Sequence, residues 1–413
     1  MPRSRWRELS LNLVLSLATV LAVLAVAELA LRWREAGSPT RRTSLADYTE
    51  YDPLLGWRKR ANVRLQFVRG EYQVPFETNS RGLRDPERDL LATPGAERIL
   101  ALGDSYVEGY TVALDQTVTQ RLEAALRRDG CRPEVINGAT TGYSTDQEYL
   151  FYASEGVKYA PGTVLLFFYQ NDVYQNDSAL FYEGVPKPFF MLRSGELRLW
   201  KQPVPRPASR APAPEEAQSD ESPLRTVEWL KSRLWFGAPL LYNRLGALGL
   251  WEANRPVGAR LEQRVFSREV IPQLEGGWQK TEAILGKLAR EVRSAGQRLL
   301  LVYVPARFEF NDRAWALTAQ KYAMKEGGWD RGLVRERLAA IAQRQETPLL
   351  DLTAAMGAAD RGALGGPYFE RDGHWNALGH ETAAREVAAW LRSAQWLPGC
   401  LPARTSEPGL SAR

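Results

Sequence analysis

The chain has 413 residues, of which 44% are hydrophobic and 25% charged, so it is long enough and apolar enough to bury a large core. The same balance excludes a chain that is disordered throughout. Its net charge is +5, from 54 basic and 49 acidic residues without a long basic run, so nucleic acid is not an expected partner.

The N-terminus is the clearest anomaly in composition. Residues 1–8 form a short flank with three arginines, and residues 9–31 follow as a stretch that is apolar around its whole circumference. That stretch is long enough to cross a bilayer, which takes about 20 residues. A cleavable signal peptide is the alternative, but its apolar core is usually only about 7 to 15 residues long, which favours an uncleaved anchor. Either interpretation exports the rest of the chain.

Residues 32–97 are predicted to form a small β-rich segment ahead of the main domain. Polar and apolar residues alternate through Val63, Leu65 and Phe67, and residues 79–85 have the composition of a turn. We expect a hairpin here, and it could lie against the functional face of the domain that follows.

From residue 98 onward, strands and helices alternate, which is typical of a parallel sheet with helices on both faces. We therefore predict a three-layer α/β/α domain over residues 98–397, with five parallel strands in flavodoxin-like order and a C-terminal tail at 398–413. The predicted strands are residues 98–103, 134–138, 163–169, 298–304 and 349–352, and the predicted helices are residues 117–128, 146–158, 268–294, 331–345 and 377–391.

A large insertion, residues 174–262, interrupts this alternation after the third strand. Its middle is rich in proline and alanine and is predicted to be an exposed linker or loop. Apolar residues then recur at helical spacing from Leu224 to Leu241, with arginine and lysine between them. This pattern predicts an amphipathic helix, which could be a lid, a core helix or a helix in the membrane interface.

The two cysteines fit an exported protein. Cys131 and Cys400 follow the predicted ends of the first and last helices of the main domain. These helices lie side by side in a flavodoxin-like order, so a disulfide between the two cysteines is a hypothesis that suits an oxidising compartment. Two unrelated free cysteines are the alternative. Two cysteines and two histidines are too few for an ordinary structural zinc site, and we expect no metal.

Polar segments follow three of the predicted strands and precede the last helix. Gly103-Asp104-Ser105 ends the first strand, although Asp104 and Ser105 could simply cap the next helix. The carboxyl ends of parallel strands meet at one edge of a sheet, so these segments should converge there. Nucleophilic catalysis at a carbonyl needs a hydroxyl, a base, a carboxylate that orients the base, and N–H donors for an oxyanion. The segments offer Ser105, Gly142, Asn171, Asp372 and His374.

In this order and spacing, the segments resemble the conserved blocks of the SGNH (GDSL-type) hydrolase superfamily of serine esterases and lipases, over roughly residues 98–395. The resemblance implies that Ser105 is the nucleophile, His374 the general base and Asp372 the residue that orients it. It also implies an oxyanion hole made by the N–H groups of Ser105 and Gly142 and the side chain of Asn171, with no cofactor. The nucleophile motif G-x-S-x-G of the α/β-hydrolase fold is absent.

Two departures from the family pattern bear on the reaction. Tyr169 stands where the third block usually begins with glycine, and we expect its side chain to narrow the pocket beside Asn171. One residue separates Asp372 from His374, where the family usually has two, and Trp375 follows. This last block also resembles membrane-associated proteins that O-acetylate exopolysaccharides or cell-wall polymers.

The resemblance therefore implies a serine esterase that hydrolyses an acyl ester, with acetyl the expected acyl group. An O-acyltransferase acting on an exopolysaccharide or cell-wall glycan is the first alternative, and an inactive carbohydrate-binding component of an envelope assembly is the second. The expected substrate is an acylated small molecule, lipid or glycan. The expected location is the bacterial inner membrane, through the N-terminal helix, with the catalytic domain periplasmic or extracellular and with envelope polysaccharide machinery as a possible partner.

The positions of four further residues in the sequence suggest roles for them. His380 falls inside the last predicted helix without a carboxylate in a matching motif, so we expect a structural role for it. Glu108, Tyr110 and Tyr143 lie close to the predicted site segments and are candidates for lining the pocket.

Overall fold

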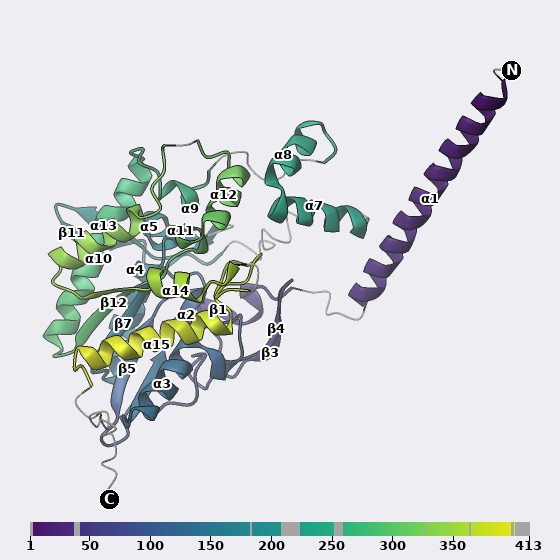
Figure 1. Ribbon diagram of the computed structural model, residues 1–413. Helices are drawn as coiled ribbons and strands as arrows, with labels where there is room; N and C mark the ends of the chain where they lie inside the picture. The colour runs from purple at the N-terminus through teal and green to yellow at the C-terminus, as the bar shows by residue number, and fades with distance from the viewer. Residues whose placement is uncertain are drawn as a thin grey trace, which may run out of the picture. The chain divides into compact units, whose positions relative to one another are not determined.

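The computed structural model describes residues 3–36, 42–181, 184–207, 224–251, 259–325, 327–362, 365–397 and 400. The chain divides into two compact units (Figure 1). The first consists of Met1–Arg42 and Pro214–Val257, and the second of Thr43–Ala213 and Gly258–Arg413. The insertion after the third strand is thus divided between the two units. Residues 201–207 have no regular structure, as predicted, whereas residues 208–223 lie outside the described residues.

A five-stranded parallel sheet forms the centre of the second unit. Its strands stand in the order β13 (Leu349–Asp351), β12 (Arg298–Tyr303), β7 (Thr163–Phe168), β5 (Glu97–Leu102) and β6 (Pro133–Asn137). β5, β7 and β12 are almost entirely buried, as expected of apolar strands covered on both faces. The predicted flavodoxin-like order is confirmed, and with it the α/β fold class.

Helices cover both faces of this sheet and create two hydrophobic clusters. On one face, α3 (Val118–Arg128) and α15 (Ala377–Ser393) pack together over β5 and β6. On the other face lie α4 (Thr145–Ser154), α10 (Pro272–Ser294) and α13 (Leu333–Arg344). Shorter helices occupy the connections: α2 (Ser105–Glu108), α5 (Asn171–Gln175), α9 (Leu261–Arg264), α11 (Arg307–Phe310), α12 (Asp312–Lys321) and α14 (Thr353–Ala359).

A disulfide joins Cys131 to Cys400, with 4.2 Å between their Cα atoms. Cys131 follows α3 and Cys400 follows α15, so the pairing of these two helices brings the cysteines together. The hypothesis that they are bonded is confirmed.

The segment before the sheet is built of two antiparallel hairpins. β1 (Thr49–Asp52) pairs with β2 (Gly56–Lys59), and β3 (Arg64–Val68) pairs with β4 (Gln73–Glu77). Aromatic side chains attach the second hairpin to the sheet domain, because the Phe67 ring stacks on Tyr110, which follows α2, at a centroid distance of 4.7 Å. The segment expected to be β-rich thus contains two hairpins, and the second of them packs against Tyr110.

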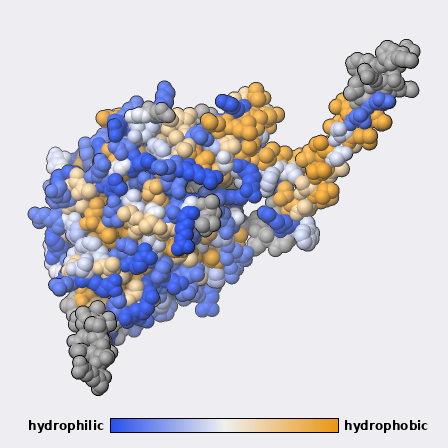
Figure 2. Space-filling model, viewed as in Figure 1, coloured by the Kyte–Doolittle hydropathy of each residue, from blue (hydrophilic) through white to orange (hydrophobic). Residues whose placement is uncertain are grey.

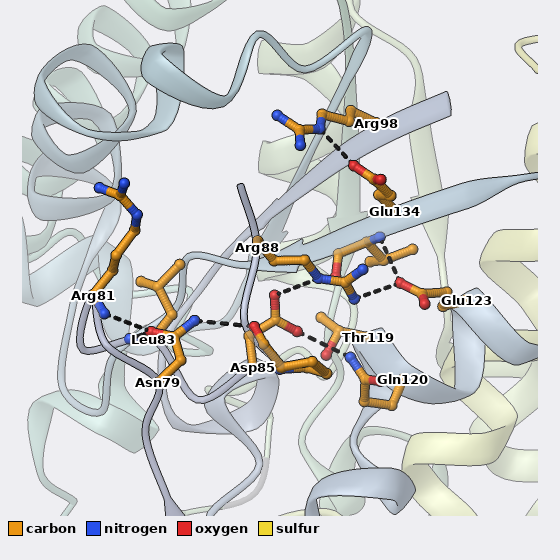
Figure 3. A network of polar contacts seen from close by, with 12 residues as sticks. Asn79, Arg81, Leu83, Asp85, Arg88, Arg98, Thr119, Gln120, Glu123 and Glu134 are labelled. Carbon is orange, nitrogen blue, oxygen red and sulfur yellow. Dashed lines mark hydrogen bonds and ion pairs between the residues drawn. The ribbon is translucent and has the colours of Figure 1, made fainter. Parts of the chain in front are cut away.

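A buried polar network holds the chain between these hairpins and β5 (Figure 3). Arg88 reaches between Asp85, at 3.2 Å, and Glu123 of α3, at 2.6 Å. Arg98 of β5 pairs with Glu134 of β6 at 2.7 Å. Buried charges are costly unless they are paired, so these contacts define the path of the chain into the sheet.

The part of the insertion within the second unit forms two short antiparallel pairs. β8 (Leu180–Phe181) pairs with β9 (Val185–Pro186), and β10 (Phe189–Arg193) pairs with β11 (Glu196–Trp200).

The first unit contains three helices in its described part: α1 (Arg3–Ala36), α7 (Arg225–Gly237) and α8 (Pro239–Ala247). Within α1, the stretch Leu11–Arg34 is long and apolar enough to cross a membrane, which makes it a candidate anchor or signal. The helical spacing read from Leu224 to Leu241 corresponds to α7 and the start of α8.

Candidate active site

Ser105 lies at the first position of a short helix that begins just beyond β5. Asp104 caps this helix α2, because its carboxylate accepts a hydrogen bond from the Tyr106 N–H at 2.9 Å. A Cβ atom on Gly103 would lie 2.7 Å from Val107 Cγ2, so the close approach of strand and helix requires glycine. The two interpretations of this stretch therefore hold together: Asp104 is a helix cap, and Ser105 is presented at the edge of the sheet.

Three of the predicted site residues form a continuous chain of hydrogen bonds. The Ser105 Oγ lies 2.7 Å from His374 Nε2, across 269 residues of sequence. The other ring nitrogen of His374, Nδ1, lies 2.6 Å from Asp372 Oδ1. Because a carboxylate oxygen accepts, Nδ1 donates to Asp372 and Nε2 is left to accept the Ser105 hydroxyl proton.

The short spacing between Asp372 and His374 is accommodated by a tight turn. Gly373 has a φ of 83°, in the left-handed region that glycine adopts without cost. Asp372 Oδ1 accepts from both the backbone N–H of His374, at 3.4 Å, and its ring. The Tyr106 hydroxyl donates to the Gly373 carbonyl at 3.0 Å, so the turn is also held from α2.

The charges of this pair shift both pKa values toward the ionised forms. Burial would raise the pKa of Asp372, but His374 and a hydrogen bond from Tyr72 outweigh burial and lower that pKa to about 2. Burial would lower the pKa of His374, but the charge of Asp372 and the hydrogen bond to it raise that pKa above its ordinary value. His374 is therefore a stronger base than a free imidazole.

The hairpin β3–β4 supplies contacts to the site that the sequence reasoning missed. The Tyr72 hydroxyl donates to Asp372 Oδ2 at 2.9 Å, on the oxygen that His374 leaves open. Glu71 Oε2 accepts from the N–H groups of Arg371, at 2.8 Å, and Asp372, at 2.7 Å. No motif marks these two residues, and only the alternating pattern of the hairpin pointed to this part of the chain.

Tyr110 is the one pocket-lining candidate that contacts the predicted base. Its hydroxyl lies 3.2 Å from His374 Nδ1, and its ring centroid lies 5.2 Å from the imidazole. Tyr143 instead donates to the Trp57 carbonyl at 2.7 Å. Glu108 is completely buried and accepts from the Thr141 N–H, so it holds the loop after β6.

The predicted oxyanion donors follow β5, β6 and β7, which are adjacent in the sheet. Gly142 has a φ of 80°, and a Cβ atom there would lie 2.5 Å from the Phe181 ring, so both its backbone conformation and its surroundings require glycine. Asn171 begins α5, and its Nδ2 donates to Asp104 Oδ2 at 3.1 Å. One of the two N–H groups of this amide is thereby engaged.

Two buried basic residues from the segment before the sheet hold the loops of the site. Lys59 donates to the Ala139 carbonyl and, at 2.8 Å, to Thr140 Oγ1, and burial lowers the pKa of this lysine to about 8. Arg84 donates to the carbonyls of Glu108, at 3.0 Å, and Val112, at 2.6 Å. The loop that carries Gly142 and the end of α2 are thus supported from the same side.

His380 has a structural role, as expected. It is buried in α15, and its Nδ1 accepts from the Val118 N–H at 3.2 Å. Burial lowers the pKa of His380 to about 3, so the ring stays neutral at ordinary pH. In the part of the chain that the structure describes, no three His, Cys, Asp or Glu side chains are grouped to hold a metal ion.

Residues 265–407 match the family model of the SGNH hydrolase-like domain of the acetyltransferase AlgX. No curated protein is similar enough in sequence to count as a match.

Similar solved structures have low identity to this chain. TesA is 11% identical, with 72% of this chain and 99% of that chain covered and a TM-score of 0.37. A mutant of Axe2, an acetyl-xylooligosaccharide esterase from Geobacillus stearmophilus, is 13% identical, with coverage of 72% and 93% and a TM-score of 0.36. A lipase/acylhydrolase from Enterococcus faecalis is 12% identical, with coverage of 72% and 96% and a TM-score of 0.36.

The flavodoxin-like sheet and the family match agree on the relationship that the sequence motifs implied. Residues 265–407 are thus similar to the SGNH hydrolase-like domain of the acetyltransferase AlgX, in agreement with the resemblance to SGNH hydrolases that the sequence motifs carry.

Proposed function

We propose that the chain is a serine esterase that cleaves an acyl ester, with acetyl the expected group, through an acyl-enzyme at Ser105. The observation that carries this proposal is the hydrogen-bonded chain from Ser105 Oγ through His374 to Asp372, with links of 2.7 Å and 2.6 Å. A hydroxyl becomes a nucleophile when a positioned base takes its proton, and this base is itself oriented by a carboxylate.

The first half of the reaction follows from these contacts. Ser105 Oγ attacks the ester carbonyl while its proton passes to His374 Nε2. The charge of Asp372 stabilises the imidazolium that forms, as the raised pKa of His374 indicates. The N–H groups of Ser105 and Gly142 and the amide of Asn171 would stabilise the oxyanion. His374 then gives its proton to the leaving alcohol, and the acyl group remains on Ser105.

In the second half, an acceptor hydroxyl attacks the acyl carbon and gives its proton to His374 Nε2. The bond between the acyl group and Ser105 Oγ then breaks, and His374 returns the proton to Ser105 Oγ. Water as acceptor gives hydrolysis, and a hydroxyl of another molecule as acceptor gives acyl transfer. The match of residues 265–407 to an acetyltransferase family favours a second candidate, an O-acyltransferase whose acceptor is a glycan hydroxyl.

The activity can be tested with p-nitrophenyl acetate as donor. We expect release of nitrophenol by the parent and its loss in Ser105→Ala and His374→Ala. Ser154→Ala is a matched control, because in the described part of the chain the Ser154 hydroxyl donates to the Leu150 carbonyl within α4. If the parent releases no nitrophenol and the alanine variants behave like it, the protein is instead an inactive binding component.

The two acceptors can be separated by analysing the products. An acetylated glycan is supplied as donor together with a competing sugar as acceptor. Free acetate identifies an esterase, and an acetylated competing sugar identifies a transferase. Either product supports the acyl-enzyme at Ser105, and the absence of both contradicts it.

We further propose that α1 anchors the chain in a bacterial inner membrane with the second unit on the periplasmic or outer side. The apolar stretch of α1 supports the anchor, and the Cys131–Cys400 disulfide supports an oxidising compartment. An acylated lipid or glycan of the envelope is the substrate class that fits this location, and polysaccharide machinery is the corresponding partner.

A further inference from the structure

The candidate membrane helix α1 carries a carboxylate that binds the beginning of α7. Glu28 accepts hydrogen bonds from the backbone N–H groups of Arg225, at 3.0 Å, and Thr226, at 2.9 Å, and from the Thr226 hydroxyl at 3.0 Å. The first N–H groups of a helix have no partner within the helix and favour a negative charge. Glu28 therefore caps α7 from a distant part of the chain. Its side chain is only 13% exposed and also pairs with Arg32 at 2.7 Å.

The position of Glu28 along α1 indicates the depth of this contact. From Leu11 to Glu28 the helix rises about 26 Å, at about 1.5 Å per residue. The hydrocarbon core of a bilayer is about 30 Å thick. If α1 spans a bilayer, Glu28 lies near one boundary of the hydrocarbon core, and the first turn of α7 lies there with it.

The helices α7 and α8 present an apolar surface that the described structure leaves open. Trp235 of α7 and Tyr242 of α8 are buried against each other, with ring centroids 5.3 Å apart, and so hold the two helices together. The space-filling view shows hydrophobic surface over these helices and along α1 (Figure 2). The large exposed apolar side chains are Leu224, Trp229, Leu230, Leu240, Leu241, Leu248 and Leu250.

The charge of the same segment complements an anionic lipid surface. Four basic residues accompany one acidic residue between residues 224 and 250: Arg225, Lys231, Arg233 and Arg244, against Glu228. The Arg233 guanidinium lies 5.4 Å from the centre of the Trp229 ring. Tryptophan and arginine are typical of the zone between hydrocarbon and headgroups, where apolar and charged surfaces are both satisfied.

We propose that α7 and α8 form an in-plane helical hairpin that lies in the interfacial zone of the bilayer that α1 spans. Their exposed leucines and Trp229 contact acyl chains, and their basic residues contact anionic headgroups. The capping contact with Glu28 holds the hairpin at this depth. The lipid bilayer is thus the partner of this surface, and the protein has a second membrane contact besides its anchor.

The test uses the full chain in vesicles of phosphatidylethanolamine and phosphatidylglycerol, with one nitroxide label per variant. The described structure has no free cysteine, so labelling without reductant modifies the introduced thiol and leaves the disulfide intact. Labels are placed by Leu230→Cys and Leu241→Cys in the hairpin. Leu17→Cys reports on α1, and Leu91→Cys, at a leucine that is 86% exposed in the second unit, serves as the water-facing control.

Collision of each label with oxygen, which concentrates in lipid, is compared with collision with a water-soluble nickel complex. In vesicles, we expect the labels at 230 and 241 to collide more often with oxygen than with the nickel complex, as the label at 17 should. The label at 91 should collide more often with the nickel complex. Nickel-favoured behaviour at 230 and 241 would contradict the proposal. Protection from both reagents would also contradict it, because a protein surface, such as a second copy of the chain, would then cover the patch. More frequent collision with the nickel complex at position 17 would show that α1 does not lie in the bilayer, and it would contradict the proposal.

Discussion

Two regions from different parts of the chain meet around His374. The loops after β5, β6 and β7 bring Ser105, Gly142 and Asn171 to one edge of the sheet, and they supply the groups that would touch a substrate. The hairpin β3–β4 supplies Tyr72, whose hydroxyl binds the carboxylate behind the base. In the proposed mechanism the strand ends provide the reacting groups, whereas the hairpin restrains the short loop that carries Asp372 and His374 through Tyr72 and Glu71.

Among the variants that test the roles of the strand ends and the hairpin, Asp372→Asn is expected to lose the most activity. Asp372→Asn removes the charge that raises the pKa of His374 and changes the acceptor that orients its ring. We expect kcat/KM for p-nitrophenyl acetate to fall by about 10³- to 10⁴-fold, as for the equivalent carboxylate of serine proteases. Asp312→Asn is the control, because the Asp312 side chain is 90% exposed and pairs with Arg331 at the surface. A loss below about tenfold at Asp372 would contradict its proposed role.

A smaller effect is expected from the accessory hairpin. Tyr72→Phe removes one hydrogen bond to a carboxylate, and such a bond contributes about 1.5–3 kcal/mol, which sets a loss of about ten- to a hundredfold in kcat. Without this hydrogen bond, the negative charge of Asp372 is less stabilised and attracts the imidazolium of His374 more strongly. The pKa of His374 should therefore rise, and the acid limb of the pH profile should move to higher pH. A purely structural role for Tyr72 would leave that limb in place.

The control for Tyr72 is Tyr152→Phe, because the Tyr152 hydroxyl contacts Gln297 and no residue of the site. It should leave both kcat and the pH profile unchanged. Equal losses in the two variants would mean that Tyr72 acts only on folding.

The pH dependence of the parent gives a further test. His374 acts as a base only when neutral, so activity falls as the pH falls through its pKa. Because Asp372 raises that pKa, the decline should begin above pH 6.5, the ordinary value for histidine, rather than at or below it. A profile of kcat/KM against pH measures this, and a rate that stays constant down to pH 4 would exclude His374 as the base.

The smallest effect on catalysis is expected at the disulfide. Cys131→Ser with Cys400→Ser should lower the free energy of unfolding by about 2–4 kcal/mol, because the bridge closes a long loop. The α15 helix extends about 25 Å from the site before it reaches the bridge, so kcat/KM should change little. Denaturant unfolding and ester hydrolysis of the same variant check both statements. A large loss of activity in folded protein would show that α3 and α15 position the site.

These regions also differ in how far the sequence could predict them. The apolar run from Ile99 to Leu102 predicts a buried strand, and Gly103 predicts the turn that ends it. Ser105 is thereby placed just beyond the end of this strand, where the structure has it. The expected order of the strands also led to the hypothesis that Cys131 pairs with Cys400, with two free cysteines as the alternative, and the structure contains this disulfide. These features depend on local rules and on a common topology.

The contacts of Tyr72 and Glu71 could not be predicted in the same way. They join positions about 300 residues apart through a hairpin whose docking depends on aromatic packing between Phe67 and Tyr110. Buried Lys59 and Arg84 are similar, since most of their partners are backbone carbonyls, which no sequence pattern marks. The packing of irregular segments over such distances depends on how well their surfaces fit, and a single sequence does not reveal that fit.

The central claim is that Ser105 carries the acyl group. The direct measurement is peptide mass spectrometry of the full-length protein, quenched in acid during turnover of p-nitrophenyl acetate. We predict an acetyl group on the peptide that contains Ser105, and its absence from the same peptide of Ser105→Ala. Turnover by the parent without acetylation of Ser105, together with undiminished turnover by Ser105→Ala, would contradict the account.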